Sequence, residues 1–253
     1  MTGYTIYNVL VVAGLVSAAV VFCFLLFFTA PYGRHVRAGW GPTLPNRLGW
    51  ILMETPAVLA ILYFCLSERS NSLGVVWLFL AIWQTHYLYR TYLFPFLLHT
   101  RGKRLPLTIV LSGVTFNVFN GYLNGRHLAW SADAYSTAWL ADPRFIAGLL
   151  LFLGGFAINI HSDHVLIALR RTSDTGYAIP HGGLYRWISC PNYFGEIIEW
   201  CGWAILTWST AGLVFAVWTA ANLVPRALSN HRWYLKQFPD YPAGRKAIFP
   251  FIL

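Results

Sequence analysis

Ionisable side chains interrupt several apolar stretches of this sequence. The acids among them are Glu54, Asp163 and Glu196, and membrane orientation does not explain them because acidic residues contribute little to topology. An ionisable residue within a membrane helix costs roughly 2.5 to 3.5 kcal/mol on insertion, so each one is by default a functional candidate. Together with nearby amides, such acids can bond the ribose and amide groups of a cofactor.

These polar groups recur at one end of the apolar runs that contain them. Asn159 and Asp163 lie four residues apart and so share one face of a helix, and Asn192 and Glu196 repeat that spacing. Five predicted helices bring polar groups to the cytoplasmic half of the membrane, which indicates one shared site. Its members are Glu54; His86, Tyr87 and Arg90; Asn159, Asp163 and Arg170; Asn192, Glu196 and Glu199; and Arg226, Asn230 and Tyr234.

Basic residues beside these helices indicate what the site could hold. Inward-facing guanidinium and ammonium groups suit a polyanionic cofactor that arrives from the cytosol. The chain has no GxGxxG and no Walker motif, so we expect a dinucleotide to be held without a Rossmann domain. The basic residues concerned are Arg101, Lys103, Arg170 and Arg226.

The histidines around Asp163 do not predict a metal site. His161 and His164 flank this acid, but a zinc site needs a third ligand and no residue supplies one at suitable spacing. The 4 cysteines include no CxxC pair. We therefore expect no bound metal.

The elements that must position these residues are membrane helices. Hydrophobic residues make up 57% of the 253 residues and charged residues only 11%, whereas soluble domains are about one-quarter charged. Lipid cannot satisfy backbone N–H and C=O groups, so apolar segments of this length form helices. The sequence predicts seven transmembrane helices, at 7–28, 48–66, 73–94, 107–123, 145–166, 192–208 and 211–230, with a tight reversal at 207–212.

The distribution of charge predicts the orientation of this all-α integral membrane protein. Most of the 18 Lys and Arg residues lie in loops on one side, which the positive-inside rule assigns to the cytoplasm, so the N-terminus is outside and the C-terminus is cytoplasmic. These scattered charges explain the net charge of +9 without nucleic-acid binding. We expect one domain over residues 1–253, most of the cofactor site within 100–253, contact with membrane lipid, and a monomer.

Several motifs spread along the chain carry a family resemblance. They are Asn-Ile-His-Ser-Asp at 159–163, Ile-Pro-His-Gly-Gly-Leu-Tyr at 179–185, Pro-Asn-Tyr-Phe-Gly-Glu-Ile-Ile-Glu-Trp at 191–200, and the tail 231–252. Glu54-Thr-Pro in the second apolar run and His86-Tyr87 in the third belong to the same set. Together they resemble the steroid 5α-reductase (3-oxo-5α-steroid 4-dehydrogenase) family over nearly the whole chain.

The resemblance implies an NADPH-dependent oxidoreductase that saturates the Δ4 double bond of 3-oxosteroids. Glu54 and Tyr87 match the pair that hydrogen-bonds the steroid 3-carbonyl, where donors stabilise the charge that develops when hydride reaches C5. Glu54 can donate only when protonated, which apolar surroundings favour. The implied cofactor-binding residues are Arg101, Lys103, Asn159, Asp163, Arg170, Tyr177, Asn192, Glu196, Arg226, Asn230 and Tyr234.

Some positions depart from the family pattern. Met53 stands before Glu54 where the family often has Gln, which removes one donor from the predicted steroid-binding site. Asn230 stands where His is common, and Lys103 stands where Arg is common. The chain shows no targeting extension, which suggests a bacterial member in the inner membrane whose substrate is an environmental steroid or another enone.

Two other classes of function remain open. The segment 191–195 and the aromatic tail also suit a methyltransferase that uses S-adenosylmethionine and a lipidic acceptor, although such an enzyme has little use for Glu54 and Tyr87. A small transporter or lipid-binding protein would also use intramembrane acids. It would need a polar path to the outer face, and the outer halves of the last three predicted helices are apolar apart from scattered hydroxyls.

Overall fold

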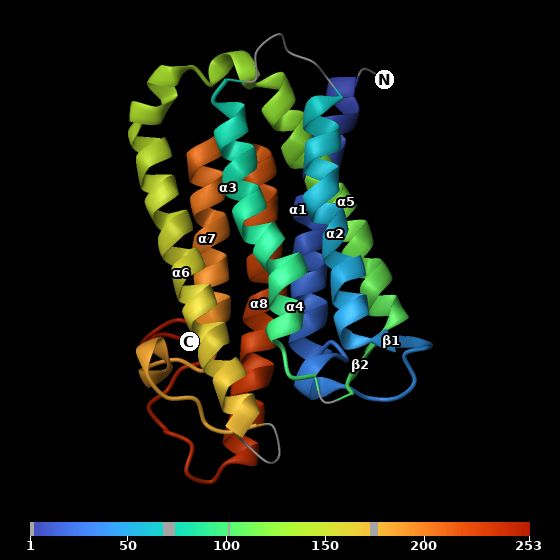
Figure 1. Ribbon diagram of the computed structural model, residues 1–253, viewed down its shortest axis with the longest axis vertical. Coiled ribbons are helices and arrows are strands. Elements are labelled where there is room, and N and C mark those ends of the chain that lie inside the picture. Colours follow the sequence, from blue (N-terminus) through green and yellow to red (C-terminus); the bar gives the residue numbers. More distant parts are fainter. Residues whose placement is uncertain (1–2, 68–73, 101, 173–176) are drawn as a thin grey trace. The chain divides into compact units, whose positions relative to one another are not determined.

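The structure, a computed structural model, describes residues 3–67, 74–100, 102–172 and 177–253. Within these ranges it consists of helices and one pair of short strands (Figure 1). The helices are α1 (Gly3–Phe27), α2 (Asn46–Leu66), α3 (Val76–Leu88), α4 (Phe94–Leu97), α5 (Leu107–Trp130), α6 (Pro143–Thr172), α7 (Pro191–Thr207) and α8 (Thr210–Gln237). The strands β1 (Thr43–Pro45) and β2 (Arg104–Pro106) pair antiparallel.

The predicted helical segments all coincide with observed helices. The segment 73–94 differs in detail, because α3 ends at Leu88 and the chain continues through a π-helical turn, Tyr89–Leu93, into α4. The predicted reversal between the last two helices is confirmed: Trp208 adopts φ 46° and ψ 46°, the left-handed conformation that commonly ends a helix. The strand pair was not predicted, because three-residue strands leave no periodic pattern.

Four helices in the described part of the chain are long and apolar enough to cross a membrane: α1, α2, the Pro143–Arg171 part of α6, and α8. The other predicted spans are shorter or more polar. Helix α7 has 17 residues, α3 has 13 before the π-helical turn, and α5 carries three buried asparagines. The count of seven spans and the orientation of the termini stay predictions.

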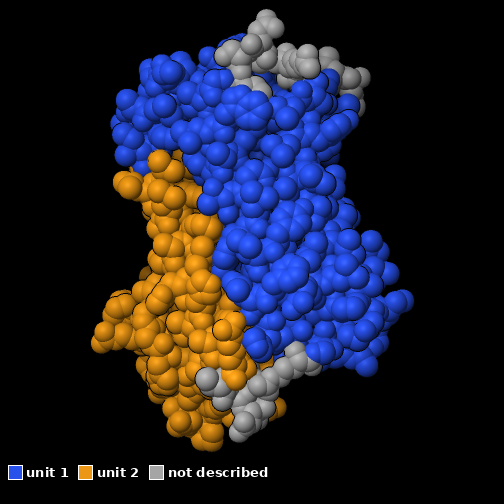
Figure 2. Space-filling view, viewed as in Figure 1, with its two compact units in different colours: residues 1–11, 31–146, 209–211 blue, residues 12–30, 147–208, 212–253 orange. Residues whose placement is uncertain are grey.

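The chain forms two compact units, which Figure 2 distinguishes by colour. Unit 1 contains Met1–Val11, Pro31–Ile146 and Ser209–Ala211, and unit 2 contains Val12–Ala30, Ala147–Trp208 and Gly212–Leu253. Unit 1 therefore holds α2 to α5 and the strand pair, while unit 2 holds α7 and most of α6 and α8.

In unit 1, α2 packs closely against α5. A Cβ atom at Gly121 of α5 would lie 2.6 Å from Ala60 Cβ, and one at Gly125 would lie 2.7 Å from Ile61 O, so only glycine permits this approach. The strand pair supports the same contact, because β1 runs directly into α2 and β2 runs directly into α5. Its register, Thr43 opposite Pro106, therefore helps to fix where α2 stands along α5.

In unit 2, glycines let α6 and α7 pack backbone to backbone. A Cβ atom at Gly155 would lie 2.5 Å from Gly195 O, and one at Gly202 would lie 2.6 Å from Gly148 O. The glycines are spaced by seven residues on each helix, and the pairing 155 with 195 and 148 with 202 shows that the helices are antiparallel. We call this contact the glycine seam.

The C-terminal tail closes unit 2 beside the start of α7. Ser189 N donates to Lys246 O at 2.8 Å and Cys190 N donates to Ala247 O at 3.1 Å, which holds the tail along the segment before α7. An apolar cluster packs beneath this segment and fixes the first turn of α7. Its buried members are Cys190, Ile197, Leu223, Ala227 and Ile248.

Candidate active site

Two hydrogen bonds between α2 and the α3 segment fix the heights of Glu54 and Tyr87 along the two helices. Trp83 Nε1 donates to Ala57 O at 3.0 Å, and Trp50 Nε1 donates to Arg90 O at 3.0 Å. The two helices run in opposite directions (Figure 1). Glu54 lies between Trp50 and Ala57 on one helix, and Tyr87 lies between Trp83 and Arg90 on the other, so the two bonds bracket both residues at one level of the helix pair.

Aromatic rings surround Tyr87. Its side chain is buried, with ring centroids 5.0 Å from Trp83 and 5.0 Å from His86. The π-helical turn begins two residues later, and such turns are frequent at functional sites because they redirect the side chains of one turn. Within it, the guanidinium of Arg90 lies 4.9 Å from the Trp50 ring and 4.5 Å from the Phe94 ring, which holds this segment against α2.

Glu54 receives a hydrogen bond from α5. Asn117 Nδ2 lies 3.3 Å from Glu54 Oε2 and 2.8 Å from Met53 O, so one buried amide holds both residues. The bond to Met53 O links α5 to the backbone of α2, and the bond to the acid was not predicted. Asn124, on the same face, bonds within α5 to Asn120.

In unit 2, the polar residues predicted on two helices meet across the glycine seam. Asn159 Nδ2 donates to Asn192 O at 2.9 Å and to Glu196 Oε2 at 3.3 Å, and Asn192 Nδ2 donates to Asp163 Oδ1 at 2.9 Å. Asn159 and Asp163 are buried on α6, and the other two lie in the first turns of α7. Across the seam, the amides of Asn159 and Asn192 therefore orient the carboxyl groups of Glu196 and Asp163.

Helix α8 joins this set through Tyr193. Arg226 Nε donates to Tyr193 Oη at 3.1 Å, and Asn230 Nδ2 lies 3.4 Å from the same oxygen. Arg226 and Asn230 are four residues apart on α8, and both are buried. Because Tyr193 follows Asn192 directly, the hydrogen bonds of α6 and α8 meet on adjacent residues of α7.

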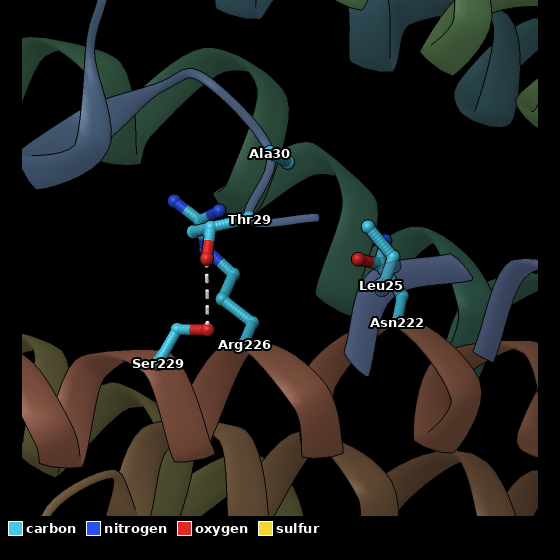
Figure 3. Close-up of a pocket in the computed structure, with 6 residues that line it drawn as sticks. All are labelled: Leu25, Thr29, Ala30, Asn222, Arg226 and Ser229. Carbon is cyan, nitrogen blue, oxygen red and sulfur yellow. Dashed lines mark hydrogen bonds between the residues drawn. The ribbon is translucent and has the colours of Figure 1, made fainter. Parts of the chain in front are cut away.

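Figure 3 shows a hollow beside Arg226, whose side chain extends from α8 toward Thr29. The hollow is open on one side and has room for little more than a water molecule. Thr29 Oγ1 and Ser229 Oγ share a hydrogen bond of 3.1 Å across it, drawn as a dashed line in Figure 3. The two hydroxyls bond each other, and most of the surface that lines the hollow is apolar. The lining residues are Leu25, Thr29, Ala30, Asn222, Arg226 and Ser229.

An aromatic group links the remaining predicted residues of unit 2. The Arg170 guanidinium lies 5.9 Å from the Tyr177 ring, whose centroid is 5.1 Å from that of Trp233. Tyr234 is buried and stacks on Tyr241 at 5.1 Å with an interplanar angle of 12°. These ring contacts hold the end of α8 against Tyr177 and Tyr241.

The other predicted cofactor residues lie in the unit 1 part of the chain. Lys103 is exposed and directly precedes β2, where its carbonyl accepts from Asn46 N at 3.1 Å. Arg101 lies outside the described residues. Apart from Lys103, the described site residues thus form two sets, one around Glu54 and Tyr87 in unit 1 and one along the glycine seam and α8 in unit 2, and a single shared site stays a prediction.

Sequence reasoning missed two residues of these sets, Asn117 as a partner of Glu54 and Tyr193 as the acceptor for Arg226 and Asn230. Tyr193 had a signal, since it lies inside a motif between Asn192 and Glu196. Asn117 had none beyond its place in a polar stripe on α5.

Comparisons with known proteins agree on one family. A sequence profile described as 3-oxo-5-alpha-steroid 4-dehydrogenase matches residues 103–253. Steroid 5-alpha-reductase DET2 of Gossypium hirsutum is 43% identical over 232 residues, which are 90% of each chain. The 3-oxo-5-alpha-steroid 4-dehydrogenase 1 of Bos taurus is 43% identical over 243 residues, or 92% of each chain. DET2 of Arabidopsis thaliana is 41% identical over 235 residues, 90% of this chain and 89% of its own.

Proposed function

Because the chain belongs to the 3-oxo-5α-steroid 4-dehydrogenase family, we propose that it uses NADPH to reduce the Δ4 double bond of a 3-oxosteroid to the 5α-reduced product. The observation that carries the proposal is the position of Glu54 and Tyr87. They lie at the same height on facing helices, between two inter-helix hydrogen bonds. Negative charge grows on the 3-oxygen as C5 accepts hydride. Two donors aimed at that oxygen lower the barrier because they bind the charged form more strongly than the ketone.

Each member of the pair has a distinct part in this proposal. Tyr87 donates its phenolic proton from a buried, ring-lined position. Glu54 donates from its protonated carboxyl group, and Asn117 holds that group on α5. Met53, the residue next to Glu54, belongs to the proposed substrate-binding set.

The residues of unit 2 fit the groups of a dinucleotide. When bound, NADPH supplies the hydride. Asp163 and Glu196 can accept from ribose hydroxyls, and the guanidinium of Arg226 can bind a phosphate. The full proposed set is Arg101, Lys103, Asn159, Asp163, Arg170, Tyr177, Asn192, Glu196, Arg226, Asn230 and Tyr234.

We extend the proposal to the setting of the enzyme. The protein is a monomer that spans a bacterial inner membrane seven times, with the N-terminus outside and the cofactor-binding residues on the cytoplasmic side. The loop charges and the apolar runs support the seven spans and their orientation, which would give a cytosolic cofactor and a lipid-soluble steroid separate routes to the enzyme.

The test is turnover by the purified, detergent-solubilised protein. With NADPH and a Δ4-3-oxosteroid, we expect NADPH oxidation and a 5α-reduced product identified by mass spectrometry. Glu54→Gln and Tyr87→Phe should each lower turnover by roughly two orders of magnitude, as loss of a transition-state donor does, while NADPH still binds. Tyr63→Phe, which removes a phenolic hydroxyl from the exposed face of α2, is the matched control.

Two outcomes would overturn this proposal. Absence of NADPH oxidation with several Δ4-3-oxosteroids would exclude the reaction, and thermal stabilisation by S-adenosylmethionine in place of NADPH would point to methyl transfer. Wild-type turnover in both variants would remove Glu54 and Tyr87 from the mechanism.

A further inference from the structure

We infer that Asn117 is a positioning residue that decides which carboxyl oxygen of Glu54 carries the acid proton. The inference rests on the proposed function, in which protonated Glu54 donates to the substrate carbonyl. A carboxylic acid has one hydroxyl oxygen and one carbonyl oxygen, and only the first can donate. The oxygen that faces the substrate therefore has to be the protonated one, and a neighbouring group has to specify it.

The amide of Asn117 can supply that specification because its orientation is fixed. Nδ2 lies 2.8 Å from Met53 O, and a backbone carbonyl can only accept, so the NH₂ group and not Oδ1 must face α2. The same nitrogen lies 3.3 Å from Glu54 Oε2. Its two hydrogens thus have two acceptors, and Asn117 presents a donor to Glu54.

The side chain from α5 bonds the α2 backbone close to a proline. Pro56 lies inside α2 and has no N–H to donate to the carbonyl of Leu52. The next carbonyl, that of Met53, accepts from Asn117. One turn earlier on α5, Gly113 leaves room for the Met53 side chain, whose Sδ would lie 2.6 Å from a Cβ atom there. Met53 is therefore fixed by α5 through both its backbone and its side chain.

The consequence for Glu54 follows from the direction of the hydrogen bond. When Glu54 is protonated, Oε2 accepts from Asn117 and is the carbonyl oxygen, so the proton lies on Oε1. The Asn117 donor also disfavours a proton on Oε2, because a hydroxyl oxygen is a poorer acceptor than a carbonyl oxygen. Asn117 thus keeps the acid proton on Oε1, the oxygen that donates to the substrate carbonyl in the proposed function, and it touches neither substrate nor cofactor in this role.

Two variants of Asn117 separate this role from a packing role. Asn117→Leu removes the donor, and we expect kcat to fall about tenfold, the effect of one lost hydrogen bond, with KM for NADPH nearly unchanged. Asn117→Asp is closest in shape but presents an acceptor, so that the two carboxyl groups compete for one proton. We expect it to lose more activity than Asn117→Leu, whereas a packing role predicts the reverse order.

The control removes another buried amide from the same helix. Asn124 lies two turns further along α5 and donates to Asn120 Oδ1 at 2.9 Å, so Asn124→Leu should lower thermal stability and leave kcat within about twofold of wild type. Because a buried aspartate can prevent folding, Asn117→Leu carries the test if Asn117→Asp gives no folded protein. Wild-type kcat in Asn117→Leu would overturn the inference.

A double-mutant cycle distinguishes failure of the inference from failure of the proposed function. In a Glu54→Ala background Asn117 has no carboxyl group to position, so adding Asn117→Leu should lower kcat no further. If the two losses multiply, Asn117 acts independently of Glu54 and the inference is wrong. If Glu54→Ala itself keeps wild-type turnover, the proposed function is wrong, whatever Asn117 does.

Discussion

Replacement of Gly155 by Ala should disturb the unit 2 site without removing any polar group. A Cβ atom at this position would lie 2.5 Å from Gly195 O and 2.8 Å from Glu199 Cα, whereas ordinary contact begins at 3.4 Å. Both neighbours are backbone atoms of α7, so no change of rotamer relieves the overlap. The two helices must therefore separate by roughly 1 Å at this level, which is the shortfall between these distances and ordinary contact.

The hydrogen bonds of Asn159, one turn further along α6, show how large the effect of Gly155→Ala should be. Its Nδ2 lies 2.9 Å from Asn192 O and 3.3 Å from Glu196 Oε2, and a separation of roughly 1 Å takes both beyond hydrogen-bond distance. Overpacking costs about 1 to 3 kcal/mol, and each lost bond about 1 kcal/mol. We expect a destabilisation of about 3 kcal/mol and, since Asn159 and Glu196 belong to the proposed cofactor set, at least about tenfold weaker NADPH binding.

The neighbouring glycine provides the control. A Cβ atom at Gly154 would meet nothing within 4 Å, so Gly154→Ala should keep or raise stability, because alanine favours the helix by about 1 kcal/mol over glycine. Thermal unfolding followed by tryptophan fluorescence and calorimetric titration with NADPH would measure both effects. Equal stability and equal NADPH affinity in the two variants would refute the reasoning.

Two further predictions concern single interactions. Tyr193→Phe removes the oxygen that accepts from Arg226 and Asn230, and should raise the Kd for NADPH by roughly tenfold; an unchanged titration would show that this oxygen does not organise the site. Hydrogen bonds from Arg144 lower the pKa of Asp142 to about 2, below its unfolded value near 4, so their stabilisation is present above about pH 4 and lost as pH falls toward 2. Asp142→Asn should therefore lower Tm slightly at pH 7, and a Tm difference from wild type that stays constant between pH 4 and pH 2 would contradict this account.

The helices were predictable because lipid leaves an apolar segment few alternatives, but their ends were not. Helix α5 continues to Trp130 and α8 to Gln237, each seven residues beyond the predicted end. A hydropathy pattern stops at polar residues, whereas a helix continues through them when they find partners. Asn124 and Asn230 are such residues, since both are buried and hydrogen-bonded.

The site was predictable where spacing along one helix decided it. Asn159 with Asp163, and Asn192 with Glu196, share a face because four residues make about one turn, and the hydrogen bonds between the two pairs confirm that expectation. Spacing along one helix does not show how far the neighbouring helix is shifted along it, and so the partner of Asn117 was not predictable.

In both units, the position of one helix along its neighbour is set by contacts between uncharged groups. In unit 1, hydrogen bonds from two tryptophans to backbone carbonyls bracket the level of Glu54 and Tyr87. In unit 2, the pairing of Gly155 with Gly195 leaves Asn159 opposite Asn192, since one lies four residues after the seam and the other three residues before it on an antiparallel helix. The glycine spacing of seven was present in the sequence on both helices, and it contains the information that polar patterns lack. A glycine or tryptophan substitution can therefore change the chemistry of this protein while every acid, amide and guanidinium of the proposed site stays in place.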